Sequence, residues 1–309
     1  KDPLLMTAVT ESDAAAGLPP RPSFATRTKR LIRKHPTATF GFVVLLIMSL
    51  LSIFAFWLTA DPLRINPIVR LKAPGYDGPL GHVGPFGTDF LGRDLFARVV
   101  HGGQISLVVG LSVAAIATII GLTVGLIAGY VRWLDAIIMR IMDGLMAIPG
   151  ILVAIALVAL AGASITNVII AITIPEVPRV VRLVRAVVLT IREMPYIEAA
   201  VVSGVSLPRI MLRHLLPNAV APLIVQATYV FASAVVFEAI LSFLGAGTPP
   251  EIPSWGNIMA EGRTYFQIAP WIIFFPGAFL AVTVLAVNVL GDGLRDSLDP
   301  RIAKRIGKG

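Results

Sequence analysis

Long apolar runs constrain the fold of this chain more than any other feature. Crossing the hydrocarbon core of a bilayer as a helix takes about 20 mostly apolar residues. The chain has 309 residues, of which 56% are hydrophobic and 14% are charged, whereas soluble domains carry about 25% charged residues. We therefore predict an all-α polytopic membrane protein with six transmembrane helices. The expected spans are residues 40–60, 105–131, 136–161, 164–190, 219–245 and 271–291.

Basic residues predict the orientation of these spans. Short cytoplasmic segments of membrane proteins are enriched in Lys and Arg. Such residues stand before the first span, between spans two and three, between spans four and five, and after the sixth span. We therefore expect the N- and C-termini to be cytoplasmic. The basic residues of that side include Arg27, Lys29, Arg30, Arg33, Lys34, Arg132, Arg140, Arg192, Arg209, Arg213, Arg295, Arg301, Lys304, Arg305 and Lys308.

Composition divides the chain into four parts. Met6 reads like a native start, so we expect residues 1–5 to be a cloning remnant. The rest of the stretch up to residue 35 lacks apolar periodicity and is expected to be a disordered cytoplasmic tail. The remaining parts are the first span with an extracytoplasmic segment (36–100), a core of five spans with a cytoplasmic loop at 193–217 (101–298), and a second cytoplasmic tail (299–309).

The polar loop 193–217 has a composition suited to docking another protein. A Glu-Ala-Ala triplet begins a short helix whose small side chains allow close approach. A glycine then permits a turn without a Cβ penalty, and the proline of a Leu-Pro pair suits the first turn of the next helix. The residues in question are Glu198, Ala199, Ala200, Gly204, Leu216 and Pro217.

The spacing of these residues resembles the EAA loop of ABC importer permeases, a helix that seats in a groove on a cytoplasmic ATPase. The stretch Arg213–Asn218 is similar to the oligopeptide and dipeptide branch of that family. The external stretch Phe86–Asp94 resembles a signature of the C-type subunit of peptide and nickel importers. The resemblance extends over residues 27–300 and implies the type I ABC importer permease fold.

This resemblance also implies a function and a set of partners. The chain is expected to be a multi-pass permease subunit of the cell (plasma or inner) membrane that carries dipeptides or oligopeptides into the cytoplasm. Its implied partners are a B-type permease in a heterodimer, two ATPase subunits or domains, and an extracytoplasmic substrate-binding protein. The chain has no Gly-x4-Gly-Lys-Ser/Thr loop for phosphates, so we expect it to bind no cofactor. ATP and Mg²⁺ would then belong to the ATPase subunits, which the EAA loop would couple to transport.

Four charged residues are expected to order the outer mouth. Asp89, Arg93 and Asp94 precede span two, where they can cap the entering helix and pair with one another. Glu238 lies inside an apolar run, and intramembrane acids are usually functional or paired. For Glu238, a role at the pore mouth and a structural hydrogen bond both remain open.

Two further features concern the spans themselves. Pro175 and Pro178 are expected to kink span four, and Glu176 between them is spaced to pair with Arg179 or Arg182. That pair is either a structural salt bridge or part of an inner cavity shaped by the kink. In span two, small residues at intervals of four favour close helix packing, within this chain or against a second permease. They are Gly121, Gly125 and Gly129.

Other functions fit the sequence less well. Cysteine is absent and the four histidines form no His-Glu-x-x-His pair, so we expect no metal site, no catalytic residue and no enzyme activity. The basic residues follow membrane orientation, so we expect no nucleic-acid partner. An ATP-independent secondary carrier is the alternative from another class. Within the favoured family, a nickel chelate, glutathione or haem remain alternative cargoes.

Overall fold

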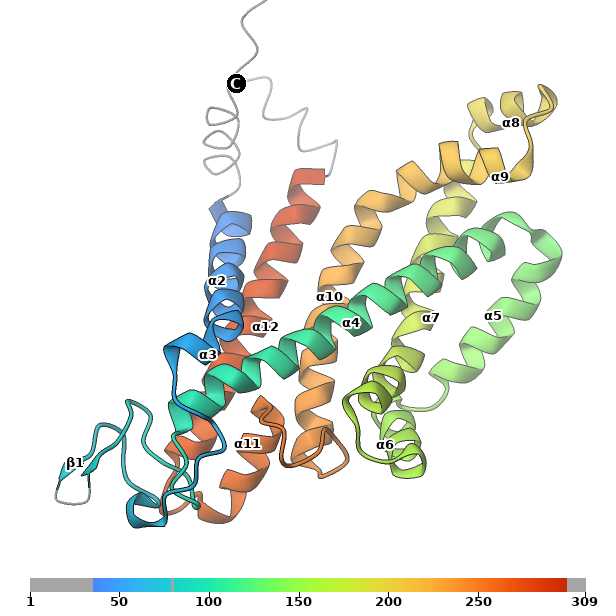
Figure 1. The fold of residues 1–309 in the computed structure, drawn as a ribbon. Helices are drawn as coiled ribbons and strands as arrows, with labels where there is room; N and C mark the ends of the chain where they lie inside the picture. The colour runs from blue at the N-terminus through green and yellow to red at the C-terminus, as the bar shows by residue number, and fades with distance from the viewer. Residues whose placement is uncertain (1–35, 79–80, 299–309) are drawn as a thin grey trace, which may run out of the picture. The chain divides into compact units, whose positions relative to one another are not determined.

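A computed structural model describes residues 36–78 and 81–298, and these residues are mainly helical (Figure 1). The expected tails 1–35 and 299–309 lie outside the described residues. The helices of at least ten residues are α2 (Pro36–Ile53), α4 (Leu95–Tyr130), α5 (Arg132–Met146), α6 (Gly150–Ala161), α7 (Ile165–Arg192), α10 (Leu216–Phe243) and α12 (Trp271–Leu298). Shorter elements are α3 (Ala55–Leu58), α8 (Pro195–Val202), α9 (Leu207–Ile210), α11 (Trp255–Gly262), the 3-10 turns at Pro67–Val69 and Arg263–Tyr265, and the antiparallel strands β1 (Asp77–Gly78) and β2 (Gly81–His82).

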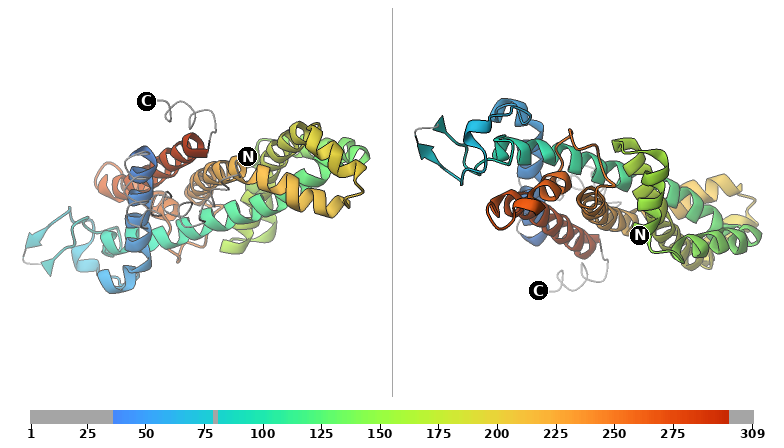
Figure 2. Two further views of the ribbon diagram at one scale, coloured as in Figure 1. Left: turned by 90° about the horizontal axis from the view of Figure 1, so that it is seen from above. Right: turned by 90° about the horizontal axis from the view of Figure 1, so that it is seen from below.

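The arrangement of the long helices agrees with the expected orientation. The described residues from Thr37 onward belong to one compact unit. In Figure 1 the start of α2, the end of α12 and the short helix α8 lie toward one end of this unit, while β1 and α11 lie toward the other. In Figure 1 the long helix α4 crosses in front of α10 and α7, against which it packs, and Figure 2 shows the same helices from above and below. The start of α2, the end of α12 and the expected docking loop therefore lie toward the same side.

Close packing of α4 on α7 explains the glycines of the second span. A Cβ atom built on Gly125 would lie 2.7 Å from Cβ of Val184, so the two backbones approach to a distance that excludes a side chain. The prediction of a packing face is confirmed, and the packing is within the chain. The pairs that meet in this way, one helical turn apart, are Gly121 with Val180, Gly125 with Val184, and Gly129 with Val188.

The third expected span is not one continuous helix, which corrects the prediction. Helix α5 ends at Met146, α6 begins at Gly150, and the two are bent by 82°. Pro149 explains the break, because proline lacks a backbone donor and restricts the residue before it to extended conformations. Of the described helices, four are long and apolar enough to span a membrane, or five if the bent pair counts as one span.

The fourth expected span is a helix of a different character. Helix α7 continues through Pro175 and Pro178 from Ile165 to Arg192, so the prolines do not end it. It is not among the four described helices that are apolar enough to span a membrane on their own. The cause is its charge, because one acid and four arginines fall within its 28 residues.

Span two starts ten residues earlier than expected, at Leu95. Its first turn is fixed by Asp94, whose Oδ1 accepts hydrogen bonds from the backbone N–H of Phe96 at 2.8 Å and of Ala97 at 3.3 Å. Such a cap satisfies donors that have no partner inside the helix. The expected capping of this helix is therefore confirmed for Asp94.

Candidate functional sites

The docking loop folds as predicted around Gly204. Helix α8 holds Glu198 in its first turn, and Gly204 follows with φ +75°. The N–H of Gly204 donates to Val201 O at 3.0 Å and the N–H of Val205 donates to Ala200 O at 3.1 Å. These two bonds form the Schellman motif, in which a left-handed residue closes a helix. Glycine is favoured there because it lacks the Cβ that makes a positive φ costly.

Pro217 lies in the first turn of α10, as predicted, but α10 has no free start. The π-helical turn Met211–Leu215 joins α9 directly to α10, so Leu207–Phe243 runs as one long helix. Leu216 and Pro217 therefore stand inside that helix and not at a free start. Pro217 has no N–H to donate to the preceding turn, and the π-helical turn stands immediately before α10. Asn218 Nδ2 also donates to His214 O at 2.7 Å.

An apolar arc marks the exposed side of α8 and of the turn that follows. We define it by Tyr196, Val201, Val202, Leu207 and Leu212, all of which are exposed. Val202 has the greatest exposure of these, at 87%. A group of exposed apolar side chains marks a site of interaction with a protein or a membrane.

Buried side chains anchor this arc to the helices below it. Ile197 of α8, Ile210 of α9 and Leu215 are all at most 2% exposed. They belong to the same buried cluster as Val188 and Ile191 of α7. Because packed cores transmit displacement with little compression, a force on α8 reaches α7 and α10 directly.

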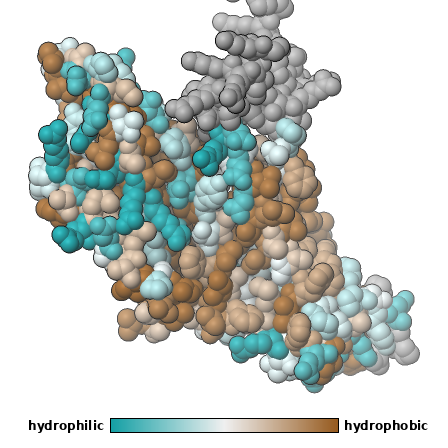
Figure 3. Space-filling view, turned by 180° about the vertical axis from the view of Figure 1, so that it is seen from behind, coloured by the Kyte–Doolittle hydropathy of each residue, from teal (hydrophilic) through white to brown (hydrophobic). Residues whose placement is uncertain are grey.

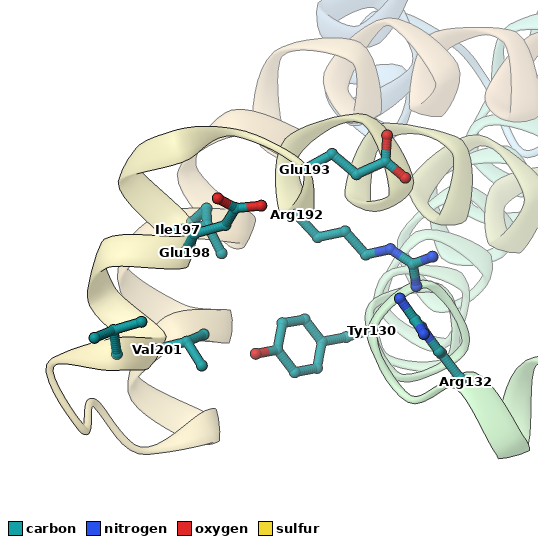
Figure 4. Close-up of a pocket in the computed structure, with 8 residues that line it drawn as sticks. Tyr130, Arg132, Arg192, Glu193, Ile197, Glu198 and Val201 are labelled. Carbon is teal, nitrogen blue, oxygen red and sulfur yellow. The ribbon is translucent and has the colours of Figure 1, made fainter.

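A cavity of 620 Å³ lies beside α8. Figure 4 shows Tyr130 and Arg132 on one side of it, Arg192 from the end of α7, and Glu198 and Val201 on α8 across the hollow. Arg192 Nη1 donates to Gly129 O at 2.9 Å, which fastens the end of α7 to the end of α4. This hydrogen bond holds together the wall of the cavity opposite α8.

At the opposite end, charged residues form a buried network. Arg93 Nε donates to Asp89 Oδ2 at 2.6 Å, which confirms the predicted pairing. Arg98 Nη1 donates to Asp89 Oδ2 at 2.9 Å and to Glu261 Oε2 at 2.5 Å. Arg93 Nη2 reaches Glu261 Oε2 as well, at 2.6 Å. The network ties the external segment to α4 and to α11.

Glu238 is fully buried among hydroxyl groups. Ser242 Oγ donates to its Oε1 at 2.8 Å and Ser106 Oγ donates to its Oε2 at 3.0 Å. The backbone N–H of Trp255 donates in turn to Ser106 Oγ at 3.4 Å. The carboxyl group thus joins α4, α10 and the start of α11, and the segment after α10 folds back against these helices.

Glu176 and Arg179 form the predicted i,i+3 pair, with Arg179 Nη1 at 3.0 Å from Glu176 Oε1. Arg182, the other candidate partner of Glu176, binds Asp143 of α5 instead, at 2.6 Å. One turn further on, Arg185 makes a bidentate pair with Asp135. Its Nε donates to Oδ1 at 2.5 Å and its Nη2 donates to Oδ2 at 2.7 Å. Sequence spacing revealed the first pair but neither of the others, because their partners lie 39 and 50 residues away.

Family models match most of the chain. Residues 121–304 match the model described as "Binding-protein-dependent transport system inner membrane component". Residues 23–74 match the model described as the N-terminal TM domain of oligopeptide transport permease C. Together the two matches include the docking loop and the described long helices, except for residues 95–120 of α4.

Individual relatives agree with the family models. A probable peptide ABC transporter permease protein of Sinorhizobium fredii is 51% identical, over 89% of this chain and 93% of that protein. The dipeptide transport system permease protein DppC of Alkalihalophilus pseudofirmus is 44% identical, over 88% of each.

A solved structure of the MetNI methionine ABC transporter in inward-facing conformations contains a chain of similar fold. The TM-score is 0.54 at 21% identity, with 65% of this chain and 96% of that chain covered. At that identity the likeness concerns the fold, which is that of a type I ABC importer permease.

Proposed function

This chain belongs to the family of binding-protein-dependent transport system inner membrane components, and on that premise we propose that it is the translocation subunit of an ATP-driven importer of peptides. Membership makes it a multi-pass membrane permease and not itself an enzyme. The cargo class follows relatives whose names specify peptides and dipeptides. ATP and Mg²⁺ would be bound by two separate ATPase subunits, and an extracytoplasmic binding protein would deliver the peptide.

One observation carries the proposal: the apolar arc is exposed in this chain while its helix is anchored to the core through Ile197. A docking element needs an exposed side chain such as Val202 to contact its partner. It also needs a buried side chain such as Ile197, because a rigidly held helix transmits movement of the partner to the spans. We assign ATPase coupling to Glu198, Ala199, Ala200 and Gly204, which shape α8 and its turn, and to Leu216 and Pro217, which begin α10.

A B-type permease is the proposed second half of the pathway. Large apolar side chains of α4 such as Leu111 and Ile119 are exposed in this chain, and a second permease would cover part of that surface. The outer-mouth residues Asp89, Arg93, Asp94 and Glu238 would hold the external end in one shape while the inner end moves. Their buried contacts favour this structural role over contact with cargo.

Glu176 and Arg179 are proposed to shape the inner cavity. Glu176 is 1% exposed and fixes one side of Arg179, whose side chain is 49% exposed. The variant Glu176→Gln removes the ion pair and keeps the side-chain size. We expect lower peptide uptake with normal assembly of the importer, and unchanged uptake would contradict the cavity role.

The test of the function is uptake by purified components. Proteoliposomes that contain this chain, the second permease, the ATPases and the binding protein are expected to accumulate radiolabelled dialanine when ATP is present. Vesicles with this chain alone are expected to accumulate none. Transport by the chain alone would instead support an ATP-independent carrier. Accumulation of glutathione, haem or a nickel chelate without dialanine would redirect the cargo assignment.

A further inference from the structure

Two exposed arginines lie halfway along α7. Arg179 is the fifteenth of 28 residues in the helix, and at about 1.5 Å per residue it is about 20 Å from the end at Arg192. Its side chain is 49% exposed, and that of Arg182 is 44% exposed. A charged side chain exposed to lipid tails at such depth costs several kcal/mol. This face of α7 is therefore unsuited to contact with lipid.

The exposed positions that follow on this face are also polar or small. Following Arg179 and Arg182 at helical spacing, the exposed positions are Ala186 and Thr190. By contrast, α4 exposes large apolar side chains, among them Ile119 at 64%. Seen from behind in Figure 3, hydrophilic side chains gather over the end that carries α5, α7 and α8, above a band of apolar ones. The two helices thus present different surfaces, one suited to water and one to lipid or protein.

Arg182 forms an ion pair with the carboxylate of Asp143 in this structure. Its Nη2 contacts Asp143 Oδ1 at 2.6 Å, and the side chain of Asp143 is 58% exposed. Ion pairs between exposed groups contribute only about 0–1 kcal/mol, so another carboxylate can replace Asp143. The guanidinium fork matches the planar geometry of carboxylates. Arg179 lies one turn away, and Glu176 holds it from the buried side.

We propose that Arg179 and Arg182 bind the carboxylate of a peptide in transit, and that Arg182 exchanges Asp143 for the cargo. The inference rests on the proposed function for its cargo. Charge complementarity carries it, because a peptide with a free C-terminus offers an anion that two adjacent arginines at this depth can accept. Asp143 keeps Arg182 paired when no peptide is present.

The absence of cysteine from the chain allows a charge-replacement experiment at Arg182. The complete importer carrying Arg182→Cys is reconstituted with thiosulfonate reagents on both faces of the membrane. One reagent adds an ammonium group to the thiol and another adds a sulfonate. We expect Arg182→Cys to lower dialanine uptake roughly tenfold, as for loss of a hydrogen bond to a charged group. The ammonium adduct is expected to restore uptake to within about threefold of the unsubstituted importer, and the sulfonate adduct is not.

Asp143→Asn separates cargo binding from a structural ion pair. This variant breaks the same pair but keeps the charge of Arg182, so uptake is expected to be unchanged or higher. Ile119→Cys on α4 is the labelling control and is expected not to react with either charged reagent. The unsubstituted importer is treated with the same reagents, so that any effect of labelling cysteines in the partner subunits is measured separately.

Three results would overturn the proposal. The first is a thiol at position 182 that does not react, which would mean that lipid or the second permease covers this face. The second is a loss of uptake in Asp143→Asn as large as that in Arg182→Cys. The third is equal transport by the two adducts. Failure of the unsubstituted importer to take up dialanine would instead overturn the assigned cargo, and this inference with it.

Discussion

Arg98 donates to Asp89 across 2.9 Å with both side chains completely buried. Breaking a buried pair by removing one partner typically costs about 3–5 kcal/mol, because the remaining charge loses its compensation. This contact joins the first turn of α4 to the external segment. It therefore determines whether the outer end of the molecule keeps its shape.

We predict that Arg98→Met destabilises the importer by about 3 kcal/mol, because Asp89 and Glu261 would share Arg93 as their remaining cation. Thermal unfolding of the purified importer in detergent measures the effect. Arg182→Met is the matched control. Its pair with Asp143 is exposed, so the midpoint is expected to change little. Equal shifts in the two variants would contradict the structural role of the buried network.

Gly125 gives a second prediction, on helix packing. A Cβ at this position would lie 2.7 Å from Val184 Cβ and 2.9 Å from Val181 O, and a backbone atom cannot move aside cheaply. Gly125→Ala is expected to cost about 1–3 kcal/mol through overpacking. Gly144→Ala on α5 is the control, since a Cβ there meets no atom within 4 Å. It is expected to be neutral or slightly stabilising in the same unfolding measurement.

Gly204 gives a third prediction, on backbone conformation. It has φ +75° with open space around a built Cβ, so any cost of substitution comes from the backbone. A left-handed conformation costs an ordinary residue about 1–2 kcal/mol, whereas Asn adopts it more readily. Gly204→Val is expected to reduce peptide uptake several-fold by displacing α8, and Gly204→Asn is expected to retain most of it. Equal uptake by both variants would show that the turn does not set the position of α8.

Local sequence patterns predicted the features that depend on short-range geometry. The interval of four between Gly121, Gly125 and Gly129 specified a packing face, and the structure supplies its partner in α7. The position of Gly204 after a short helix predicted a turn, and in the structure Gly204 makes that turn in the left-handed conformation. The acid at position 94 specified a helix cap. The turn and the cap follow from bonds within about one helical turn, and the packing face follows from the repeat of the helix.

Features that depend on distant contacts were not predictable from the sequence. Glu261 completes the outer network across 163 residues from Arg98, and no spacing rule connects them. Pro149 was visible, but whether it bends or ends a span depends on the packing of α6 against α7. The continuity of the helix through Pro217 depends on a π-turn, which a sequence pattern does not specify.

Val202→Asp tests the central claim that transport is driven through α8. Val202 is 87% exposed in this chain, so the substitution leaves the fold intact, while a charge buried in an apolar contact with an ATPase is strongly unfavourable. The measurement is ATP-dependent dialanine uptake and ATP hydrolysis in the same proteoliposomes, with Val202→Thr as the uncharged control. We predict at least a roughly tenfold loss of uptake per ATP hydrolysed for Val202→Asp and near-normal coupling for Val202→Thr. Import by Val202→Asp at the unsubstituted rate and with the unsubstituted ratio of peptide to ATP would contradict the account.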